Sequence, residues 1–203
     1  QNAQKYYTEY RKLDTAEKML TDLIAKGQQE LLYIDSVFDA VSRTDSESDL
    51  AEIRRELREQ GYLKGGVRAD EKVKKTSAPL RFRSSEGFEI LVGRNNRQND
   101  QLTLKTAKAG DIWLHTQGIA GSHVIICTEG KQPGEQTLFE AAQLAAYHSK
   151  GRSGSGVAVD YVPVKFVKKP AGSKPGMVIF TNNRTLFVTP DENLVNSLKT
   201  DSK

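Results

Sequence analysis

The 203-residue chain has one cysteine and one tryptophan, and it lacks any long hydrophobic run. One cysteine cannot form an internal disulfide bond, so we expect burial to stabilise the fold and the cytoplasm to be its compartment. The longest apolar stretches, such as residues 124–127, are far shorter than the roughly 18 residues of a transmembrane helix, and no signal peptide is recognisable after Gln1. These absences predict no membrane partner. Because the chain does not begin with Met, we expect it to be part of a longer protein.

Charge is unevenly distributed along the chain. Residues 1–60 contain 9 Lys and Arg against 13 Asp and Glu, a net charge of −4, whereas residues 61–203 contain 21 against 13, a net charge of +8. An acidic part followed by a basic part indicates two bodies with different roles. The basic body is the candidate for contact with a polyanion such as RNA, although basic domains without such a partner are common.

The acidic part begins with the pattern of a long helix. Its seam of a heptad repeat is interrupted only by Glu17 and Gly27, and it predicts one helix over residues 2–41. The seam positions are spaced alternately four and three residues apart. Its apolar members are Tyr6, Tyr10, Leu13, Leu20, Ile24, Leu31, Ile34, Phe38 and Val41.

A shorter second helix completes an antiparallel helical, coiled-coil segment over residues 1–63. It is expected to follow a cap at Asp45 or Ser46 and to end at Gly61. Its apolar stripe is too short to cover the first helix, so we expect the long helix to pack against a further antiparallel helix. Residues 64–78, with adjacent glycines and five Lys or Arg, predict a linker.

From residue 79 the pattern changes to short strands mixed with helices. Strands are expected at residues 80–83, 88–92, 112–115, 122–127, 157–167, 177–180 and 185–188, and helices at residues 94–108 and 135–149. Because strands and helices do not strictly alternate, this order predicts an α+β domain with a mixed sheet over residues 79–190. Residues 191–203 are expected to be a C-terminal tail.

Chemistry-bearing side chains are concentrated around the strand expected at residues 112–115. Side chains alternate along a strand, so Asp111, Trp113 and His115 share one face. A tryptophan between a carboxylate and an imidazole offers a stacking surface flanked by hydrogen-bonding groups, which suits a nucleobase or a ribose. The alternative is that Trp113 belongs to the core and that the two polar residues lie at the strand edge.

Signals for catalysis or metal binding are weak. Ser122 could act with a histidine and Asp111 as a nucleophilic triad, but no Gly-x-Ser-x-Gly elbow is present, and Ser122 and His123 would point to opposite faces of a strand. The spacing of His115, His123 and Cys127 fits no recognised zinc site. We therefore expect no catalytic residue, no metal and no cofactor.

Two basic clusters are candidates for tracking an RNA backbone, with a plain solvated surface as the alternative. The first, in the helix expected over residues 94–108, contains Arg94, Arg97, Lys105 and Lys108. The second, around a loop rich in proline and glycine, contains Lys165, Lys168, Lys169 and Lys174.

Several separated motifs resemble the NFACT-R domain, and the match covers residues 79–190. In order, the motifs are Gly93-Arg94-Asn95-Asn96, Asp111-Ile112-Trp113-Leu114-His115, Gly121-Ser122-His123-Val124, Lys168-Lys169-Pro170 and Lys174-Pro175-Gly176. The preceding helical segment resembles the coiled-coil middle region of the same family, the bacterial RqcH or fibronectin-binding protein A-like proteins. One departure is Ala120, at a position where the family usually has proline before Gly-Ser-His.

The resemblance implies a role in ribosome-associated quality control. Members of this family bind obstructed large ribosomal subunits that carry peptidyl-tRNA, and they recruit alanyl-tRNA for the addition of C-terminal alanine tails. Peptidyl transfer belongs to the ribosome, so the expected function is an RNA- and ribosome-binding module and not an enzyme. Its expected partners are the large ribosomal subunit, ribosomal RNA and tRNA.

The contact surface expected from the motifs and the basic clusters comprises Asp111, Trp113, His115, Ser122, His123, Arg94, Asn95, Arg97, Lys168, Lys169 and Lys174. Two other classes of function stay open. One is an adhesin that binds fibronectin, as the older family name suggests. The other is an RNA-processing enzyme that uses His115 and Asp111 as acid and base.

Overall fold

The computed structural model describes residues 2–44, 46–64 and 77–200. The chain forms two compact units, residues 1–34 and residues 35–203. Helix α1 (Asn2–Ser42) is continuous through residue 34, as the long seam predicts. No helix among the described residues is long and apolar enough to cross a membrane.

The seam residues of α1 within the first unit are exposed to solvent. The exposed fraction of Tyr6 is 69%, that of Leu13 is 63% and that of Ile24 is 60%. An isolated helix gains little from its intrinsic propensity, so an apolar stripe of this length indicates packing against another helix. That partner remains an expectation.

Helix α2 (Glu47–Glu59) confirms the second predicted helix. Its cap is Ser46, whose side chain accepts a hydrogen bond from the Ser48 backbone N–H at 3.2 Å. Asp45, the alternative cap, lies outside the described residues, as do residues 65–76 of the expected linker. The helix is followed by Gly61 at a φ of +81°, a backbone conformation that glycine adopts without strain. Helix α2 belongs to the second compact unit, which begins at residue 35.

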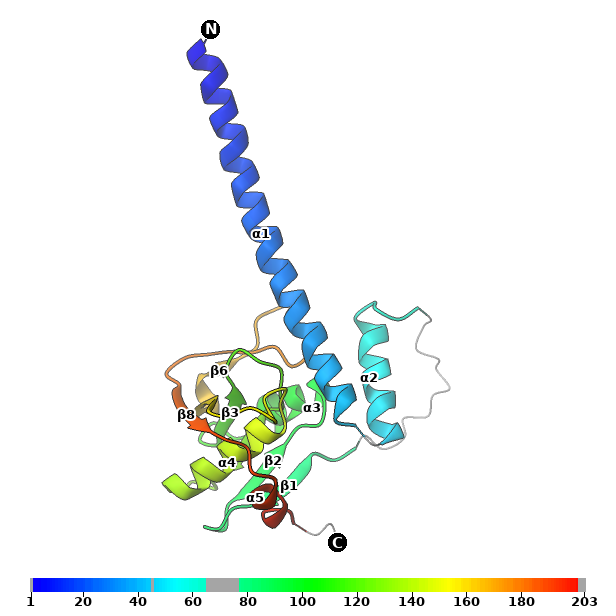
Figure 1. Ribbon diagram of the computed structural model, residues 1–203, viewed down its shortest axis with the longest axis vertical. Coiled ribbons are helices and arrows are strands. Elements are labelled where there is room, and N and C mark those ends of the chain that lie inside the picture. Colours follow the sequence, from blue (N-terminus) through cyan, green and yellow to red (C-terminus); the bar gives the residue numbers. More distant parts are fainter. Residues whose placement is uncertain (1, 45, 65–76, 201–203) are drawn as a thin grey trace. The chain divides into compact units, whose positions relative to one another are not determined.

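The second unit is built on a six-stranded sheet (Figure 1). Its strands, in spatial order, are β1 (Leu80–Arg83), β2 (Glu89–Val92), β4 (Val124–Cys127), β3 (Ile112–Thr116), β5 (Val157–Pro163) and β8 (Arg184–Val188). All five pairings are antiparallel, so the expectation of a mixed sheet is wrong. Short loops join β1 to β2 and β3 to β4, and short loops can connect only antiparallel neighbours.

One face of the sheet is covered by helix α4 (Glu135–Tyr147), as Figure 1 shows. The small side chains of α4 allow close packing against the strands, and Ala141, Ala145 and Ala146 are fully buried in this core. Helix α5 (Glu192–Ser197) completes the same core with Val195. This part of the predicted tail is therefore folded, and an isolated bridge between Phe82 and Lys199 covers the outer edge of β1.

The opposite face of the sheet carries a smaller apolar core made by Leu91, Leu102, Trp113, Ile125, Val162, Val164 and Val167. Helix α3 (Asn96–Gln101) is capped by Asn95 and continues as the π-helix η1 (Leu102–Thr106). The predicted helix over residues 94–108 is thus shorter than expected, and Lys108 lies outside it.

Two predicted strands also end differently. Residues 164–166 form the 3-10 turn η2 (Val164–Phe166), in which the Val167 backbone N–H donates to the Val164 carbonyl. The Val164 backbone N–H donates to the Asp111 carbonyl at 2.8 Å. The chain then enters a separate two-stranded sheet of β6 (Val167–Lys168) and β7 (Ile179–Phe180). Ser122 and His123 precede β4 and lie outside the strand that was expected to contain them.

Candidate RNA-binding surface

Trp113 is a core residue and does not provide an exposed stacking surface. Its side chain is 1% exposed, and it lies opposite Ile125 of β4 and Val162 of β5. The Phe180 ring lies 4.9 Å from the Trp113 ring between centroids. This burial agrees with the alternative that Trp113 belongs to the core, because η1 and the segment after β5 cover its face of the sheet.

Asp111 has a structural role next to Trp113. It is 4% exposed, and one of its carboxylate oxygens, Oδ1, accepts hydrogen bonds from the Thr128 backbone N–H at 2.9 Å and the Thr128 hydroxyl at 3.1 Å. The other, Oδ2, accepts from the Lys108 backbone N–H at 2.8 Å. This carboxylate thereby joins the loop before β3 to the end of β4.

His115 and His123 complete a ring cluster with Trp113. The His115 ring is nearly parallel to the Trp113 ring at 5.7 Å between centroids, and the His123 ring meets the Trp113 ring edge-on at 5.2 Å. The His123 Nδ1 and the Thr103 hydroxyl of η1 share a 2.8 Å hydrogen bond. Burial lowers the pKa of His115 and holds that of His123 well below its usual value, so both rings are neutral near pH 7.

Ser122 is not arranged as a nucleophile. Its hydroxyl donates to the Gly93 carbonyl and accepts from Nη1 of Arg43 at 3.1 Å. The side chain is 1% exposed, and its contacts join the loop before β4 to the end of α1. Among the described residues, no group of three or more His, Cys, Asp or Glu side chains is placed to hold a metal ion.

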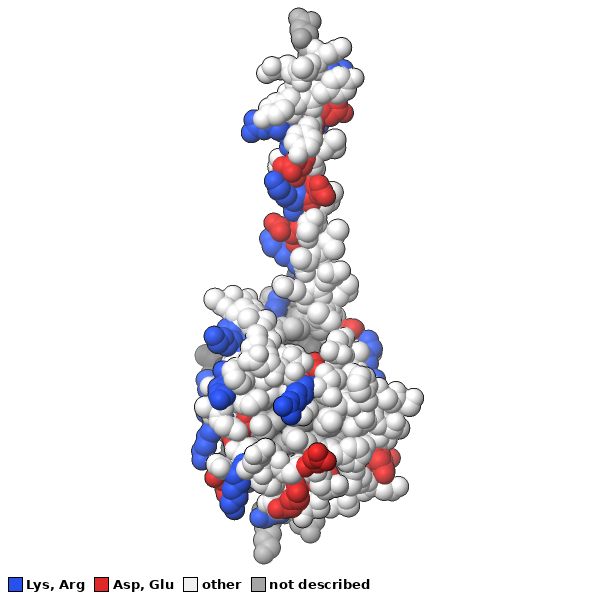
Figure 2. Space-filling model, turned by 90° about the vertical axis from the view of Figure 1, so that its left-hand side faces the viewer, with Lys and Arg blue, Asp and Glu red and all other residues white. Residues whose placement is uncertain are grey.

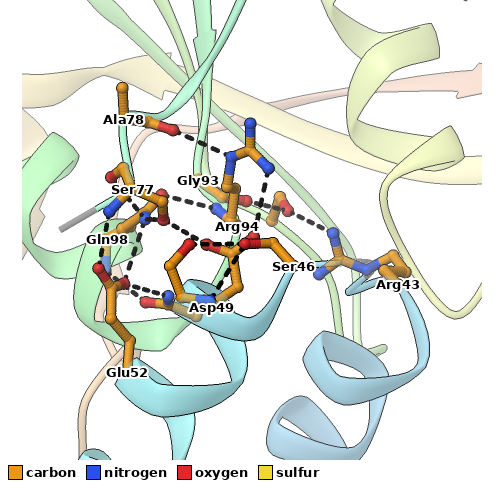
Figure 3. A network of polar contacts seen from close by, with 12 residues as sticks. Arg43, Ser46, Asp49, Glu52, Ser77, Ala78, Gly93, Arg94 and Gln98 are labelled. Carbon is orange, nitrogen blue, oxygen red and sulfur yellow. Dashed lines mark hydrogen bonds and ion pairs between the residues drawn. The ribbon is translucent and has the colours of Figure 1, made fainter. Parts of the chain in front are cut away.

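Arg94 belongs to a polar network beside α2 (Figure 3), and Asn95 joins this network through Glu52. Nη1 of Arg94 forms an ion pair with the buried Asp49 carboxylate at 3.2 Å, and its Nε donates to the Ala78 carbonyl at 3.0 Å. Glu52 accepts from the Asn95 side-chain amide at 2.7 Å and from the Gln98 side-chain amide at 3.2 Å.

Three more of the predicted contact residues have intramolecular partners. Arg97 pairs with Glu59 of α2 at 2.6 Å, and Lys169 pairs with Asp100 of α3 at 2.5 Å. The Lys174 ammonium donates to the Tyr62 hydroxyl at 2.6 Å. The sequence pattern did not indicate these contacts, although Asp49, Glu52, Glu56 and Glu59 do recur at helical spacing along α2.

Four exposed lysines form what we call the lysine strip, which consists of Lys105, Lys108, Lys165 and Lys168. The Lys165 backbone N–H donates to the Ala109 carbonyl at 3.2 Å, which brings the two predicted basic clusters together. None of the four ammonium groups has an ion pair with a carboxylate in the described ranges. Figure 2 shows Lys and Arg side chains along one side of the folded body.

Apolar side chains lie among these lysines. Leu104 is 42% exposed beside Lys105, and Ile179, the partner of Lys168 in the small sheet, is 58% exposed. The Lys165 ammonium lies 5.0 Å from the centre of the Phe166 ring. A positively charged surface with interspersed apolar groups suits a single-stranded nucleic acid, whose phosphates and bases need different contacts.

Comparison with known proteins identifies this class of domain. Residues 79–182 match the family described as the NFACT protein RNA binding domain, and residues 1–77 match the NFACT N-terminal and middle domains. The α+β unit is thus an RNA-binding-type domain that follows a helical middle region. The chain belongs to the NFACT family.

Curated relatives are longer than this chain. It is 43% identical over 201 residues to the Rqc2 homolog RqcH of Bacillus subtilis, and 44% identical over 200 residues to that of Streptococcus suis. Each alignment covers 98% of this chain but only 35% and 36% of the respective relative, so the chain spans about a third of their length.

A solved structure supports the fold. It is the C-terminal part of the fibronectin/fibrinogen-binding protein from Streptococcus suis, which is 44% identical with a TM-score of 0.87. The match covers 98% of this chain and 79% of that one.

Proposed function

We propose that the α+β domain binds RNA through the lysine strip and is the RNA- and ribosome-binding module of a ribosome-associated quality-control factor. The observation that carries this proposal is the presence of four exposed lysines, none of which has an ion pair with a carboxylate of the described residues, on a domain of an RNA-binding family. Backbone phosphates are the expected ligands, because lysine is a compact charge without the planar geometry used to read bases.

The relatives suggest the wider setting of this activity. In our proposal, the longer protein binds large ribosomal subunits that carry peptidyl-tRNA and recruits tRNA for alanine tailing. The present domain contributes to RNA binding. The domain itself needs no catalytic residue for this role. The buried contacts of Asp111 and Ser122 support that reading, since both side chains are used in holding loops together.

The first test compares two matched double variants of the whole chain. Lys108→Gln/Lys165→Gln removes two charges from the strip, and Lys131→Gln/Lys199→Gln removes two exposed charges elsewhere on the same unit. Binding to single-stranded RNA and to large ribosomal subunits is measured across a salt series. Each lost phosphate contact makes the slope of log affinity against log salt less steep by roughly 0.7 to 0.9. The slope of the strip variant should therefore be less steep than that of the wild type by about 1.5. Equal slopes for the two variants would remove the strip from the proposal.

The same preparations test the two rival functions. Fibronectin binding is suggested by the name of the similar streptococcal protein, and immobilised fibronectin provides the assay. RNA integrity after incubation with the wild type and with His115→Ala tests for processing activity. Cleavage that the variant loses would replace a binding role by a catalytic one. Fibronectin binding without RNA binding would favour the adhesin.

A further inference from the structure

A groove of about 380 Å³ lies between α2, α3 and η1. Its wall includes Arg55, Glu59, Arg97, Leu104, Lys105 and Pro175, together with two further carboxylates, Glu52 and Asp100. Lys105 is also the first member of the lysine strip, so the groove opens beside that surface.

A single carboxylate is held between two guanidinium groups in this groove. The Arg55 Nε lies 3.0 Å from the Glu59 Oε1, and the Arg97 Nη1 lies 2.6 Å from the Glu59 Oε2. The exposed fractions of the three side chains are 41%, 37% and 39% for Arg55, Arg97 and Glu59, so solvent and ligands reach all of them. Partial burial alone would raise the pKa of Glu59, but the hydrogen bonds and charges of Arg97 and Arg55 outweigh it and lower that pKa.

Glu59 occupies a position that is otherwise poor for a carboxylate. It is the last residue of α2, where the helix dipole disfavours negative charge. The two arginines therefore stabilise the Glu59 carboxylate at the end of the helix. Guanidinium groups bind phosphate oxygens as readily as carboxylate oxygens, and exposed ion pairs add little to stability, so one anion can replace the other at small cost.

The side-chain amides of Asn95 and Gln98 engage Glu52, and Lys169 engages Asp100, so both of these carboxylates already have donors. The other parts of the groove fit a nucleotide. Lys105 has no ion pair with a described carboxylate, and the partly exposed Leu104 and Pro175 offer apolar contact for a nucleoside. We propose that the groove binds one nucleotide of an RNA chain, whose backbone phosphate replaces the Glu59 carboxylate between Arg55 and Arg97. This inference rests on the proposed RNA binding, and it extends the RNA path from the lysine strip to α2.

Two matched pairs of variants test the inference in the full chain. Glu59→Gln frees both arginines, and its control Glu47→Gln removes the same charge from the exposed first turn of α2. Arg55→Gln removes one guanidinium from the groove, and its control Arg54→Gln removes the exposed neighbouring one. A fluorescent single-stranded RNA of about 20 nucleotides is titrated across a salt series, with adenosine monophosphate as competitor.

We expect Glu59→Gln to bind RNA roughly 5-fold more tightly and with a salt slope steeper by about 0.7, the value for one phosphate of a single strand. Arg55→Gln should shift both quantities in the opposite direction. Each control should leave the slope at the wild-type value. Adenosine monophosphate should compete weakly, because it lacks the contacts that a longer strand makes with the lysine strip.

Other outcomes separate this inference from the proposed function. If wild-type binding depends on the lysine strip but Glu59→Gln and Glu47→Gln bind RNA with equal affinity, the groove proposal is wrong and the proposed function is retained. A folded Glu59→Gln variant that binds RNA more weakly than the wild type also overturns the groove. If neither the wild type nor Glu59→Gln binds RNA, both proposals fail. Efficient competition by adenosine monophosphate would assign the groove to free nucleotides and not to an RNA chain.

Discussion

Replacing Trp113 distinguishes a core residue from an RNA contact more sharply than any other change. The side chain is 1% exposed. A buried tryptophan removes about 150–250 Å² from water, which at about 25 cal/mol per Å² gives an upper bound of about 4–6 kcal/mol. Measured Trp→Ala changes in cores cost about 3–5 kcal/mol, so we expect Trp113→Ala to lower the free energy of unfolding by about 4 kcal/mol.

Urea denaturation measures this loss. With a slope of about 2 kcal/mol per molar urea, the midpoint should fall by about 2 M. Trp113→Phe should cost less than half as much, because the indole Nε1 has no hydrogen-bond partner among the described residues and its removal breaks no such bond. The double variant Lys108→Gln/Lys165→Gln should keep the wild-type midpoint, since both lysines are exposed.

The opposite pattern would refute the reasoning. If Trp113→Ala unfolds at the wild-type urea concentration and loses RNA affinity, the tryptophan is a stacking surface and the ring cluster opens in solution. A large loss of stability with RNA affinity retained under native conditions agrees with the core assignment.

Further predictions concern protonation and backbone packing. Burial, followed by the charges of Arg43 and Arg152, lowers the pKa of His148 to about 3, so the unfolded chain binds a proton below pH 6.5 that the folded chain excludes. The free energy of unfolding should therefore fall as pH drops from 7.5 to 5.5. Urea titrations of His148→Leu should show a smaller slope of this free energy against pH, by up to about 1.4 kcal/mol per pH unit, which corresponds to one proton. Gly27→Ala should stabilise α1 by about 1 kcal/mol in thermal circular dichroism, because it lies in the helix interior with open space around it. Gly93→Ala places a Cβ 2.1 Å from the Asn99 Oδ1 and should cost about 1–3 kcal/mol, whereas Gly110→Ala meets no atom within 4 Å and should leave the urea midpoint nearly unchanged.

Elements set by local periodicity were predictable. The heptad seam gave the extent of α1 within one residue at its C-terminal end, and the capping residue Ser46 began α2 as expected. Strands β1 and β2 and helix α4 also follow their sequence patterns. The π-helix η1 was not predictable in this way, because its Ala107 N–H bonds the Leu102 carbonyl five residues earlier, and this single widened turn has no distinct apolar period.

The candidate site was predictable only in part. Lys105, Lys108, Lys165 and Lys168 were recognisable as basic residues in two clusters, but their union depends on a backbone contact between Lys165 and Ala109. Arg94 has the residue type of an RNA contact, yet the buried Asp49 carboxylate of α2 engages it, and without RNA Arg97 is paired with Glu59. Helical spacing could have indicated that the acids of α2 share a face, but not which basic surface they meet.

The sequence by itself determined the division of charge, the helical part and the α+β class, because each depends on composition or on contacts between near neighbours. It also determined that Asp111, Trp113 and His115 share a face of one strand, since alternation is a property of any strand. Only the tertiary structure decided that this face is covered. Its cover comes from η1 and from residues 164–180, whose positions depend on pairings between segments far apart in the chain. The four side chains of the lysine strip lie outside that cover and are exposed.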